Sequence, residues 1–436
     1  MTDPASPRAR RLVVHTRETP HIEDVLAYAD PAHPLVWQRR GDGFVGIGMI
    51  TALEVGGRRP EPEEGTRAAA LAEAWRAVAD AADVRDEVGL PGTGLVGFGA
   101  LAFADGSAST STIIVPRAVV GRRDGRSWVT TVRWADAAEP ATAPEPRAFG
   151  PYWSATLGPG VLDAPGYQAA VRAALAAIGE GEVSKVVLAR DLVGTVPAGA
   201  DVRRLVRALA SGYPDVWTFA VDGLVGASPE TLVTVTGGTV TARVLAGTAS
   251  RGADADADTR ASLDLATSAK DQDEHQYAVR SVLASLRPHT TALASGETPF
   301  TLKLPNVWHL ATDIEGELSY GASALELVGA LHPTAAVAGS PTPAALAAIE
   351  RLEPFDRGRY AGPVGWIDAA GDGEWAIALR CAQFGPSART DGHSWQLERT
   401  RQVIAHAGAG IVAGSDPESE LLETRVKFRP IVDALA

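Results

Sequence analysis

The run QVIAHAGAGIVAGSDPESELLETRVKF (402–428) decides the local fold near the carboxyl end of the chain. Its first residues, 402–405, predict a strand, three closely spaced glycines follow, and Pro417 marks the first turn of a predicted helix. Glycines before a helix let backbone amides approach an anion, so this loop is a candidate anion site. A tight turn between a strand and a helix explains the same glycines without a ligand, and both interpretations stay open.

Two pairs of carboxylates lie on predicted helices. Glu420 and Glu423 are three residues apart on the helix just described, and therefore share one face. The segment SAKDQDEHQYAVRSVL (268–283) places Asp271 and Glu274 in the same relation. A solvated helix face explains either pair alone. If the pairs converge, the four carboxylates would repel one another unless a divalent cation lay between them, and hard oxygen ligands favour magnesium.

Two cations in the same half of the chain are candidates for binding an anion. Arg380 lies in WAIALRCA (375–382), an apolar run that predicts a buried strand, where an unpaired guanidinium would be costly. It therefore needs a carboxylate partner, either from the protein or from a bound substrate. Lys427 follows Glu423 by one helical turn and can reach either a metal ligand or the same substrate.

Lysine is rare in this chain, because only four of the 40 basic residues are lysines. A guanidinium is always charged, so an arginine-rich chain still needs lysine wherever a nitrogen must lose its proton. Lys185 begins the strand-like run SKVVLAR (184–190), where burial would favour the neutral amine that a general base requires. Glu230, in GASPETLV (226–233), enters another predicted strand and is a candidate for the complementary acid.

The composition argues against several functional classes. The 436 residues carry a formal net charge of -13, which disfavours nucleic acid or an anionic membrane as the partner. There is no signal-peptide core and no run of about 18 uninterrupted apolar residues, so we expect a cytoplasmic protein. Cys381 is the single cysteine and predicts a small buried side chain. Because His309, His332 and His406 stand singly, we expect core or pocket histidines rather than metal ligands.

The pattern of elements predicts an α/β chain without regular βαβ spacing. The first 150 residues are rich in strands, such as the run at 44–53, and include one helix at 65–83. An Ala-, Pro- and Glu-rich segment (135–151) predicts an exposed connection within one domain, because later isolated strands need partners from the first half. No nucleotide-binding glycine motif follows a strand. The later predicted elements include strands at 184–196, 231–236, 362–368 and 374–383 and helices at 165–181, 201–211 and 268–287.

Taken together, these segments resemble the chorismate-utilising enzymes, and within that family the isochorismate synthases of menaquinone and siderophore pathways. The resemblance covers about residue 165 to the end, whereas residues 1–160 match only loosely. It implies a single chorismate-binding domain over 1–436, with a two-layered, mostly antiparallel β core wrapped by helices. The matching pieces, in the family's order, are SKVVLAR, GASPETLV, VLAGTASRG, KDQDEHQ, WHLATDIEG, LHPTAAVAGSP, GPVGWIDAAGDGEWAIALRCA and AGAGIVAGSDPESELLETRVKF.

The resemblance also implies roles for residues of this chain in a magnesium-dependent conversion of chorismate to isochorismate. Lys185 matches the general base, which activates a water to attack C2 of chorismate. Glu230 matches the general acid, which protonates the hydroxyl that leaves from C4. The positions that match magnesium-binding carboxylates are Glu274 and Glu423, with Asp271 and Glu420 as companions that act directly or through water. The positions that match the lining of the chorismate site are Gly247, Thr248, His309, Tyr360, Arg380, Gly410 and Lys427.

Other functions on the same scaffold stay open. Salicylate synthases share the lysine and the metal ligands and carry isochorismate onward to pyruvate loss, so they are the main alternative. Anthranilate synthases lack a lysine at the position of Lys185, and the aminating enzymes use ammonia from a glutaminase partner. An inactive chorismate-binding paralogue would not need to keep Lys185 and Glu230. The segment LHPTAAVAG (331–339) favours an isochorismate synthase, which we expect to be a monomer.

Overall fold

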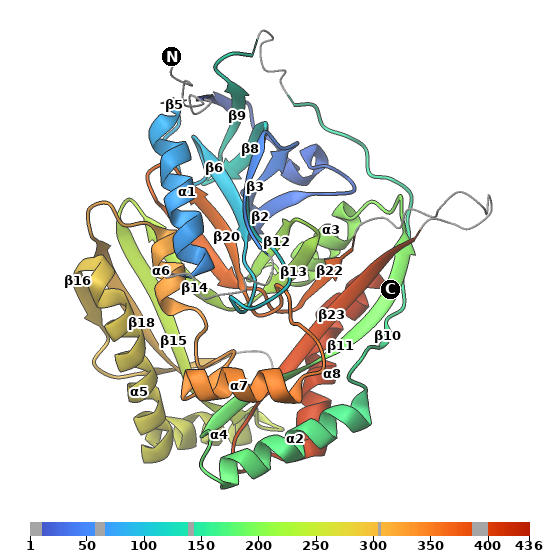
Figure 1. Ribbon diagram of the computed structural model, residues 1–436, viewed down its shortest axis with the longest axis vertical. Coiled ribbons are helices and arrows are strands. Elements are labelled where there is room, and N and C mark those ends of the chain that lie inside the picture. Colours follow the sequence, from blue (N-terminus) through green and yellow to red (C-terminus); the bar gives the residue numbers. More distant parts are fainter. Residues whose placement is uncertain (1–10, 57–65, 138–143, 304–306, 386–399) are drawn as a thin grey trace, which may run out of the picture.

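The computed structural model describes residues 11–56, 66–137, 144–303, 307–385 and 400–436. Its strands form two large sheets, and the helices lie around them (Figure 1). Antiparallel pairing dominates, because β1 with β5 is the only parallel pair among the described strands. The predicted α/β fold with a mostly antiparallel β core is therefore confirmed.

The first sheet has 13 strands and includes segments from both halves of the sequence. In spatial order they are β10 (Gly158–Pro159), β11 (Lys185–Pro197), β23 (Thr400–Ile411), β22 (Cys381–Phe384), β13 (Leu224–Ser228), β12 (Trp217–Val221), β2 (Leu35–Arg39), β3 (Asp42–Ile47), β8 (Ala118–Arg123), β9 (Arg126–Trp134), β1 (Leu12–Thr19) and β5 (Asp83–Asp86), with β19 (Gly339–Ser340) beside β11. The two halves join where β12 pairs with β2, with Phe219 opposite Trp37.

The second sheet has 10 strands and also includes segments from both halves of the sequence. In spatial order they are β16 (Thr290–Ser295), β18 (Val307–Leu318), β15 (Thr239–Ser250), β14 (Thr231–Thr236), β21 (Gly373–Ile377), β20 (Pro363–Asp368), β6 (Val96–Ala100), β7 (Ser111–Val115) and β4 (Thr51–Val55), with β17 (Phe300–Lys303) beside β18. Because β6 pairs with β20, residues before 160 contribute strands to both sheets.

Eight α-helices and two short 3-10 helices are described around the two sheets. They are α1 (Arg67–Ala81), α2 (Ala164–Gly179), α3 (Arg203–Gly212), α4 (Ala255–Thr267), α5 (Ala269–Leu286), α6 (Ala324–Leu331), α7 (Thr342–Leu352) and α8 (Pro417–Leu435), with short 3-10 helices η1 (Val25–Tyr28) and η2 (Arg287–His289). Figure 1 shows α5 beside β15 and β18 on one side, α2 and α8 beside β11 and β23 on the other, and α7 between them. No helix in the described ranges is long and apolar enough to cross a membrane.

Aromatic side chains pack between the two sheets. The Phe44 ring from β3 lies 5.3 Å from Phe98 of β6 and 5.4 Å from Trp366 of β20, in edge-to-face geometry. The indole N–H groups of Trp37 and Trp366 donate to the Glu374 carboxylate at 2.7 and 3.1 Å. Both buried donors are therefore satisfied, and the Trp37 bond joins the first sheet to the second.

Two predicted strands are wrong in the same way, because the chain changes sheets within each apolar run. The run at 44–53 contains the end of β3 in the first sheet and the start of β4 in the second. The run at 374–383 contains β21 in the second sheet and β22 in the first, and Arg380 lies between them. The helices predicted at 65–83 and 165–181 are confirmed, with every boundary within two residues of the predicted one.

Two glycines in neighbouring strands make room for Trp375. Gly99 on β6 is opposite Gly365 on β20, which is opposite Trp375 on β21. A methyl group at Gly99 would stand 2.2 Å from Trp375 Cη2, far inside van der Waals contact. We therefore expect Gly99→Ala to lower the free energy of unfolding by about 1–3 kcal/mol, as measured by urea denaturation. Gly106→Ala has open space at its position and should be close to neutral; equal losses would contradict the steric explanation.

Candidate active site

Lys185 is the first residue of β11, and its side chain lies beside the neighbouring strand β23. The strands are antiparallel, with Val187 opposite Gly410. A methyl group at Gly410 would stand 3.1 Å from Lys185 Cε and 3.9 Å from its Nζ. The glycine therefore leaves room for the half-buried lysine chain. Among the described residues, no hydrogen bond or ion pair holds the Lys185 amine.

We expect Gly410→Ala to disturb Lys185 while leaving the fold intact. The added methyl group would press on the flexible end of the lysine, which can move by a few tenths of an ångström. Small displacements of a reacting group are costly, so the rate with chorismate, the substrate that the resemblance implies, should fall about tenfold. Gly179→Ala, where nothing lies near the added methyl group, is the matched control. An unchanged rate in Gly410→Ala would show that the contact with Lys185 is unimportant.

Glu230 lies where the chain passes from the first sheet to the second, between β13 and β14. The Ile377 N–H donates to the Glu230 carbonyl at 3.0 Å, which ties this crossing to β21. Burial raises the pKa of the Glu230 carboxyl, and the charges of three cations, Lys185, Lys427 and Arg380, oppose that effect. Glu230 therefore sits within electrostatic reach of all three cations in surroundings that favour its protonated form.

Arg380 lies at the return crossing, between β21 and β22. Its φ of 48° is in the left-handed region, which is strained for a long side chain. Its carbonyl accepts from the Ala227 N–H at 3.1 Å, close to the crossing at Glu230. Burial lowers the pKa of Arg380, whereas the charges of Tyr360, Glu423 and Glu230 oppose that effect. Within the described chain no carboxylate forms an ion pair with its guanidinium, so the choice between the two predicted partners stays open.

Neutral buried groups border this region. Tyr360 stacks on His406, with ring centroids 5.2 Å apart. Burial raises the pKa of the Tyr360 phenol and lowers that of His406 to about 4. His332 Nε2 donates to the Phe103 carbonyl at 2.9 Å, so the prediction of hydrogen-bonded or packed histidines is confirmed for both. Cys381 is buried as predicted, and burial raises the pKa of its thiol to about 12.

Helix α8 brings two carboxylates and a lysine to the same region. Lys427 Nζ lies 2.5 Å from Glu423 Oε1, one helical turn away as predicted, and donates to the Gly408 carbonyl at 2.8 Å. Burial lowers the pKa of Lys427, which Glu423 opposes. Burial raises the pKa of Glu420, and the charge of Glu423 acts in the same direction. A divalent cation would relieve the repulsion between these two carboxylates.

The predicted glycine-rich loop is wrong in part, because Gly408 and Gly410 lie in β23 and only Gly414 lies between that strand and α8. The short loop that remains closes on itself. The Val412 N–H donates to Ser415 Oγ at 3.1 Å, and the Ser415 N–H donates to the Val412 carbonyl at 2.9 Å. At the start of the helix, the Ser419 N–H donates to the Asp416 carboxylate at 2.9 Å. These amides serve a tight turn and a helix cap, which is the alternative to an anion-binding loop.

On the second sheet, Gly247 lies at a bulge where β15 shifts its register against β18. Its φ of 77° favours glycine. The His309 Nδ1–H donates to the Gly247 carbonyl at 3.3 Å, and a methyl group at Gly247 would stand 3.3 Å from Asp271 Cβ. Burial lowers the pKa of His309, with Lys185 acting in the same direction and Glu423 opposing it. His309, whose ring bonds to the bulge, therefore lies within electrostatic reach of Lys185 in the first sheet and of Glu423 on α8.

The predicted metal site lies only partly within the described structure. The side chains of Thr248 and Glu274 are outside the described residues. Within the described part, no group of three or more His, Cys, Asp or Glu side chains is close enough to hold a metal ion. Asp271 lies on α5 and the pair Glu420 and Glu423 on α8, so the convergence of the two carboxylate pairs stays a prediction.

His275 is a buried residue of this region that the sequence pattern did not single out. It lies on α5, and its ring contacts both β15 and β18. It follows Asp271 by four residues, so both share one helix face. That spacing was the signal available in the sequence, but it does not indicate which strands the ring meets.

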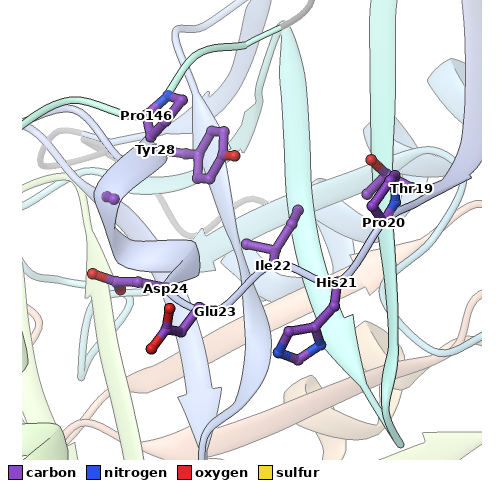
Figure 2. Close-up of a pocket in the computed structure, with 9 residues that line it drawn as sticks. Thr19, Pro20, His21, Ile22, Glu23, Asp24, Tyr28 and Pro146 are labelled. Carbon is purple, nitrogen blue, oxygen red and sulfur yellow. The ribbon is translucent and has the colours of Figure 1, made fainter.

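Two pockets lie apart from these residues. One of about 390 Å³ is lined by residues 19–24, which begin at the last residue of β1, together with Ala27, Tyr28 and Pro146 (Figure 2). Another of about 590 Å³ is lined by residues of α4 and β18, including Asp258 and Trp308. None of the predicted site residues lines either pocket. The candidate site is therefore located by its charged side chains and not by a pocket.

Known proteins resemble this chain over most of its length. The family model described as "Chorismate binding enzyme" matches residues 153–436. Isochorismate synthase DhbC of Bacillus subtilis (strain 168) is 42% identical over 281 residues, which cover 62% of this chain and 67% of that protein. Putative isochorismate synthase MenF of Mycobacterium tuberculosis (strain ATCC 25618 / H37Rv) is 42% identical over 268 residues, which cover 59% of this chain and 68% of that protein.

A solved structure resembles the amino-terminal part as well. The crystal structure of putative 2,3-dihydroxybenzoate-specific isochorismate synthase DhbC from Bacillus anthracis aligns with a TM-score of 0.70 at 30% sequence identity. The alignment covers 94% of this chain and 98% of that chain. The family resemblance predicted from the motifs is therefore confirmed, and the structural alignment extends over most of the loosely matching first 160 residues.

Proposed function

We propose that this chain, which belongs to the chorismate-binding enzyme family, is an isochorismate synthase that converts chorismate to isochorismate. Its similarity to proteins of that name supports the reaction. The observation that carries the proposal is that Lys185 on β11 and Glu230, between β13 and β14, share one group of interacting charges with Arg380 and Lys427. A candidate base and a candidate acid thus stand beside two further cations that suit an anionic substrate.

In the proposed reaction, Lys185 is the general base and Glu230 the general acid. Lys185 takes a proton from a water molecule as the water oxygen bonds to C2 of chorismate. Both ring double bonds shift, from C1–C2 to C1–C6 and from C5–C6 to C4–C5, and the C4 hydroxyl leaves as water with a proton from Glu230. One water enters and one leaves, so the reaction is an isomerisation. Burial, which raises the pKa of Glu230, supports its role because a general acid must hold its proton before the step.

We assign recognition of a substrate carboxylate to Arg380. Its side chain is half-buried near the site, and no described carboxylate of the protein forms an ion pair with it. A bidentate bond to a carboxylate of chorismate would compensate the cost of this burial. The other residues that we propose to line the chorismate site are Gly247, Thr248, His309, Tyr360, Gly410 and Lys427.

We further propose a magnesium ion held by Glu274 and Glu423, with Asp271 and Glu420 as companions directly or through water. When bound, the ion would neutralise the C1 carboxylate of the substrate among these acidic side chains. Helix α8 supports this assignment, because Glu423 raises the pKa of Glu420 in addition to burial, and a cation relieves such repulsion. Lys427 balances part of the Glu423 charge through their ion pair.

The direct test is incubation of the purified chain with chorismate and MgCl₂, followed by chromatographic separation of isochorismate, salicylate and pyruvate. We expect isochorismate as the product, loss of activity after chelation with EDTA, and recovery on addition of Mg²⁺. Salicylate and pyruvate as direct products would support a salicylate synthase instead. Anthranilate formed with added ammonia would indicate an aminating enzyme, and the absence of any turnover would indicate an inactive paralogue.

Two further proposals concern the chain as a whole. We propose that it acts as a monomer, which size-exclusion chromatography with light scattering would test. We also propose a cytoplasmic protein without a nucleic-acid partner, which the net charge of -13 favours.

A further inference from the structure

His275 lies on the face of α5 that packs against the second sheet, and it is 1% exposed. One ring nitrogen, Nδ1, lies 3.1 Å from the Ala246 carbonyl on β15. The other, Nε2, lies 2.7 Å from Thr312 Oγ1 on β18. A single buried ring therefore joins one helix to two strands.

The partners of the His275 ring define its hydrogen-bond pattern. A carbonyl oxygen only accepts, so Nδ1 carries the hydrogen and donates to Ala246. In the neutral ring Nε2 then accepts, and the Thr312 hydroxyl donates to it. Both nitrogens are satisfied although the ring is buried, so any other orientation would leave unpaired polar atoms.

These contacts lie directly behind the proposed site. Ala246 precedes Gly247, the residue at the bulge whose carbonyl accepts from His309. Asp271 lies one helical turn before His275, and its Cβ would be 3.3 Å from a methyl group at Gly247. The histidine ring, the bulge and the first turns of α5 therefore form one packed unit.

We infer that His275 is a positioning residue, which holds α5 against the Gly247 bulge and thereby sets where Asp271 and Glu274 stand. This inference rests on the proposed function, in which those two carboxylates bind magnesium. His275 itself needs no contact with the substrate or the ion. Loss of a side chain that orients metal ligands from behind typically weakens metal affinity about 10- to 100-fold.

Two substitutions at His275 test the inference. His275→Phe keeps a ring but removes both hydrogen bonds, whereas His275→Asn keeps an amide that can donate to Ala246. Calorimetric titration with MgCl₂ in the absence of chorismate measures ion binding, and initial rates give the Mg²⁺ concentration for half-maximal activity. We expect His275→Phe to raise the Mg²⁺ dissociation constant and the Mg²⁺ concentration for half-maximal activity about tenfold or more. The KM for chorismate at saturating Mg²⁺ should change less. His275→Asn should recover part of the loss.

Thr312→Val is a second variant that keeps the test decisive if the phenylalanine variant does not fold. It removes only the hydroxyl that bonds Nε2, and it should shift both Mg²⁺ values in the same direction. Thr130→Val is the matched control, because Thr130 is also fully buried and its hydroxyl lies 2.7 Å from Thr16 Oγ1 in the first sheet. This control should lose stability without a change in the Mg²⁺ dissociation constant or in the Mg²⁺ concentration for half-maximal activity.

The outcomes separate this inference from the proposed function. Wild-type Mg²⁺ values in His275→Asn and Thr312→Val would overturn the inference, and so would an equal shift in Thr130→Val, because lost stability would then explain the effect. A wild-type chain that binds no Mg²⁺ would also overturn it. A wild-type chain that binds Mg²⁺ but makes no isochorismate would contradict the proposed function, while the binding titration would still decide the role of His275.

Discussion

We expect Lys185→Ala to lower the turnover of chorismate by about 10²- to 10⁴-fold, the range that a general base contributes. The other lysine of the site cannot take over readily, because Lys427 is bound to Glu423 at 2.5 Å and to the Gly408 carbonyl at 2.8 Å. The fold should tolerate the change, since the Lys185 amine has no hydrogen-bond partner among the described residues. Initial rates of isochorismate formation and the melting temperature together measure both expectations.

Lys185→Arg separates proton transfer from charge. A guanidinium stays protonated, so this variant keeps a positive charge near Glu230 but cannot accept a proton. It should be as inactive as Lys185→Ala. Lys303→Ala is the matched control, because Lys303 is exposed and lies 3.6 Å from Asp258, outside the proposed site. Activity of Lys185→Arg close to that of the wild type would show that Lys185 supplies charge and not a base.

We expect Glu230→Gln to lower kcat by a similar factor, about 10²- to 10⁴-fold, because glutamine has the shape of glutamate but cannot protonate the leaving hydroxyl. The pH dependence gives a second readout. Glu230 acts in its protonated form, so kcat should fall as the pH rises through its pKa. Because burial raises that pKa, the fall should lie above the range of an ordinary glutamate, and a profile of kcat against pH should lack it in Glu230→Gln.

The same pKa has a consequence for stability. A carboxyl whose pKa is raised in the folded state stabilises it at low pH, and this contribution is lost as the pH rises through the raised pKa. The unfolding free energy of the wild type should show that loss, and Glu230→Gln should not. Glu182→Gln, at an exposed ion pair with Arg351, is the control that should keep the wild-type rate and pH profile. If kcat of Glu230→Gln still falls as the pH rises, the fall must come from the titration of another group.

Local signals in the sequence predicted the helices near the site. The helix expected at 268–287 spans 269–286, and the one expected from about residue 417 begins at Pro417. Each follows a capping side chain, Ser268 or Asp416, whose oxygen accepts a backbone N–H of the first turn. Such signals lie within a few residues of the boundary that they set, so they can be found without knowledge of the fold.

The crossings between the two sheets could not be predicted in this way. The apolar run 374–383 is typical of one strand, and its residues would be buried in either sheet, so the pattern does not show that the chain turns at Arg380. The approach of Glu230 to Lys185 depends on such crossings and on the pairing of strands distant in the sequence.

Within the site, contacts along one helix were predictable and contacts between elements were not. Lys427 follows Glu423 by one turn, and their charged groups lie 2.5 Å apart. His275, in contrast, meets Ala246 and Thr312 on two strands far away in the sequence. Spacing along the chain indicates which face of α5 the ring occupies, but the identity of its partners depends on tertiary packing.

The pairing of β2 with β12 affects how the protein is made. Residues 35–39 leave the ribosome long before residues 217–221, their partners in the first sheet. Until then the nascent strands present an open edge of unpaired backbone amides, which favours association between growing chains. Contacts between such distant segments also slow folding. Production of this protein should therefore depend on chaperones that shield open strand edges during translation, and lower growth temperatures should raise its yield.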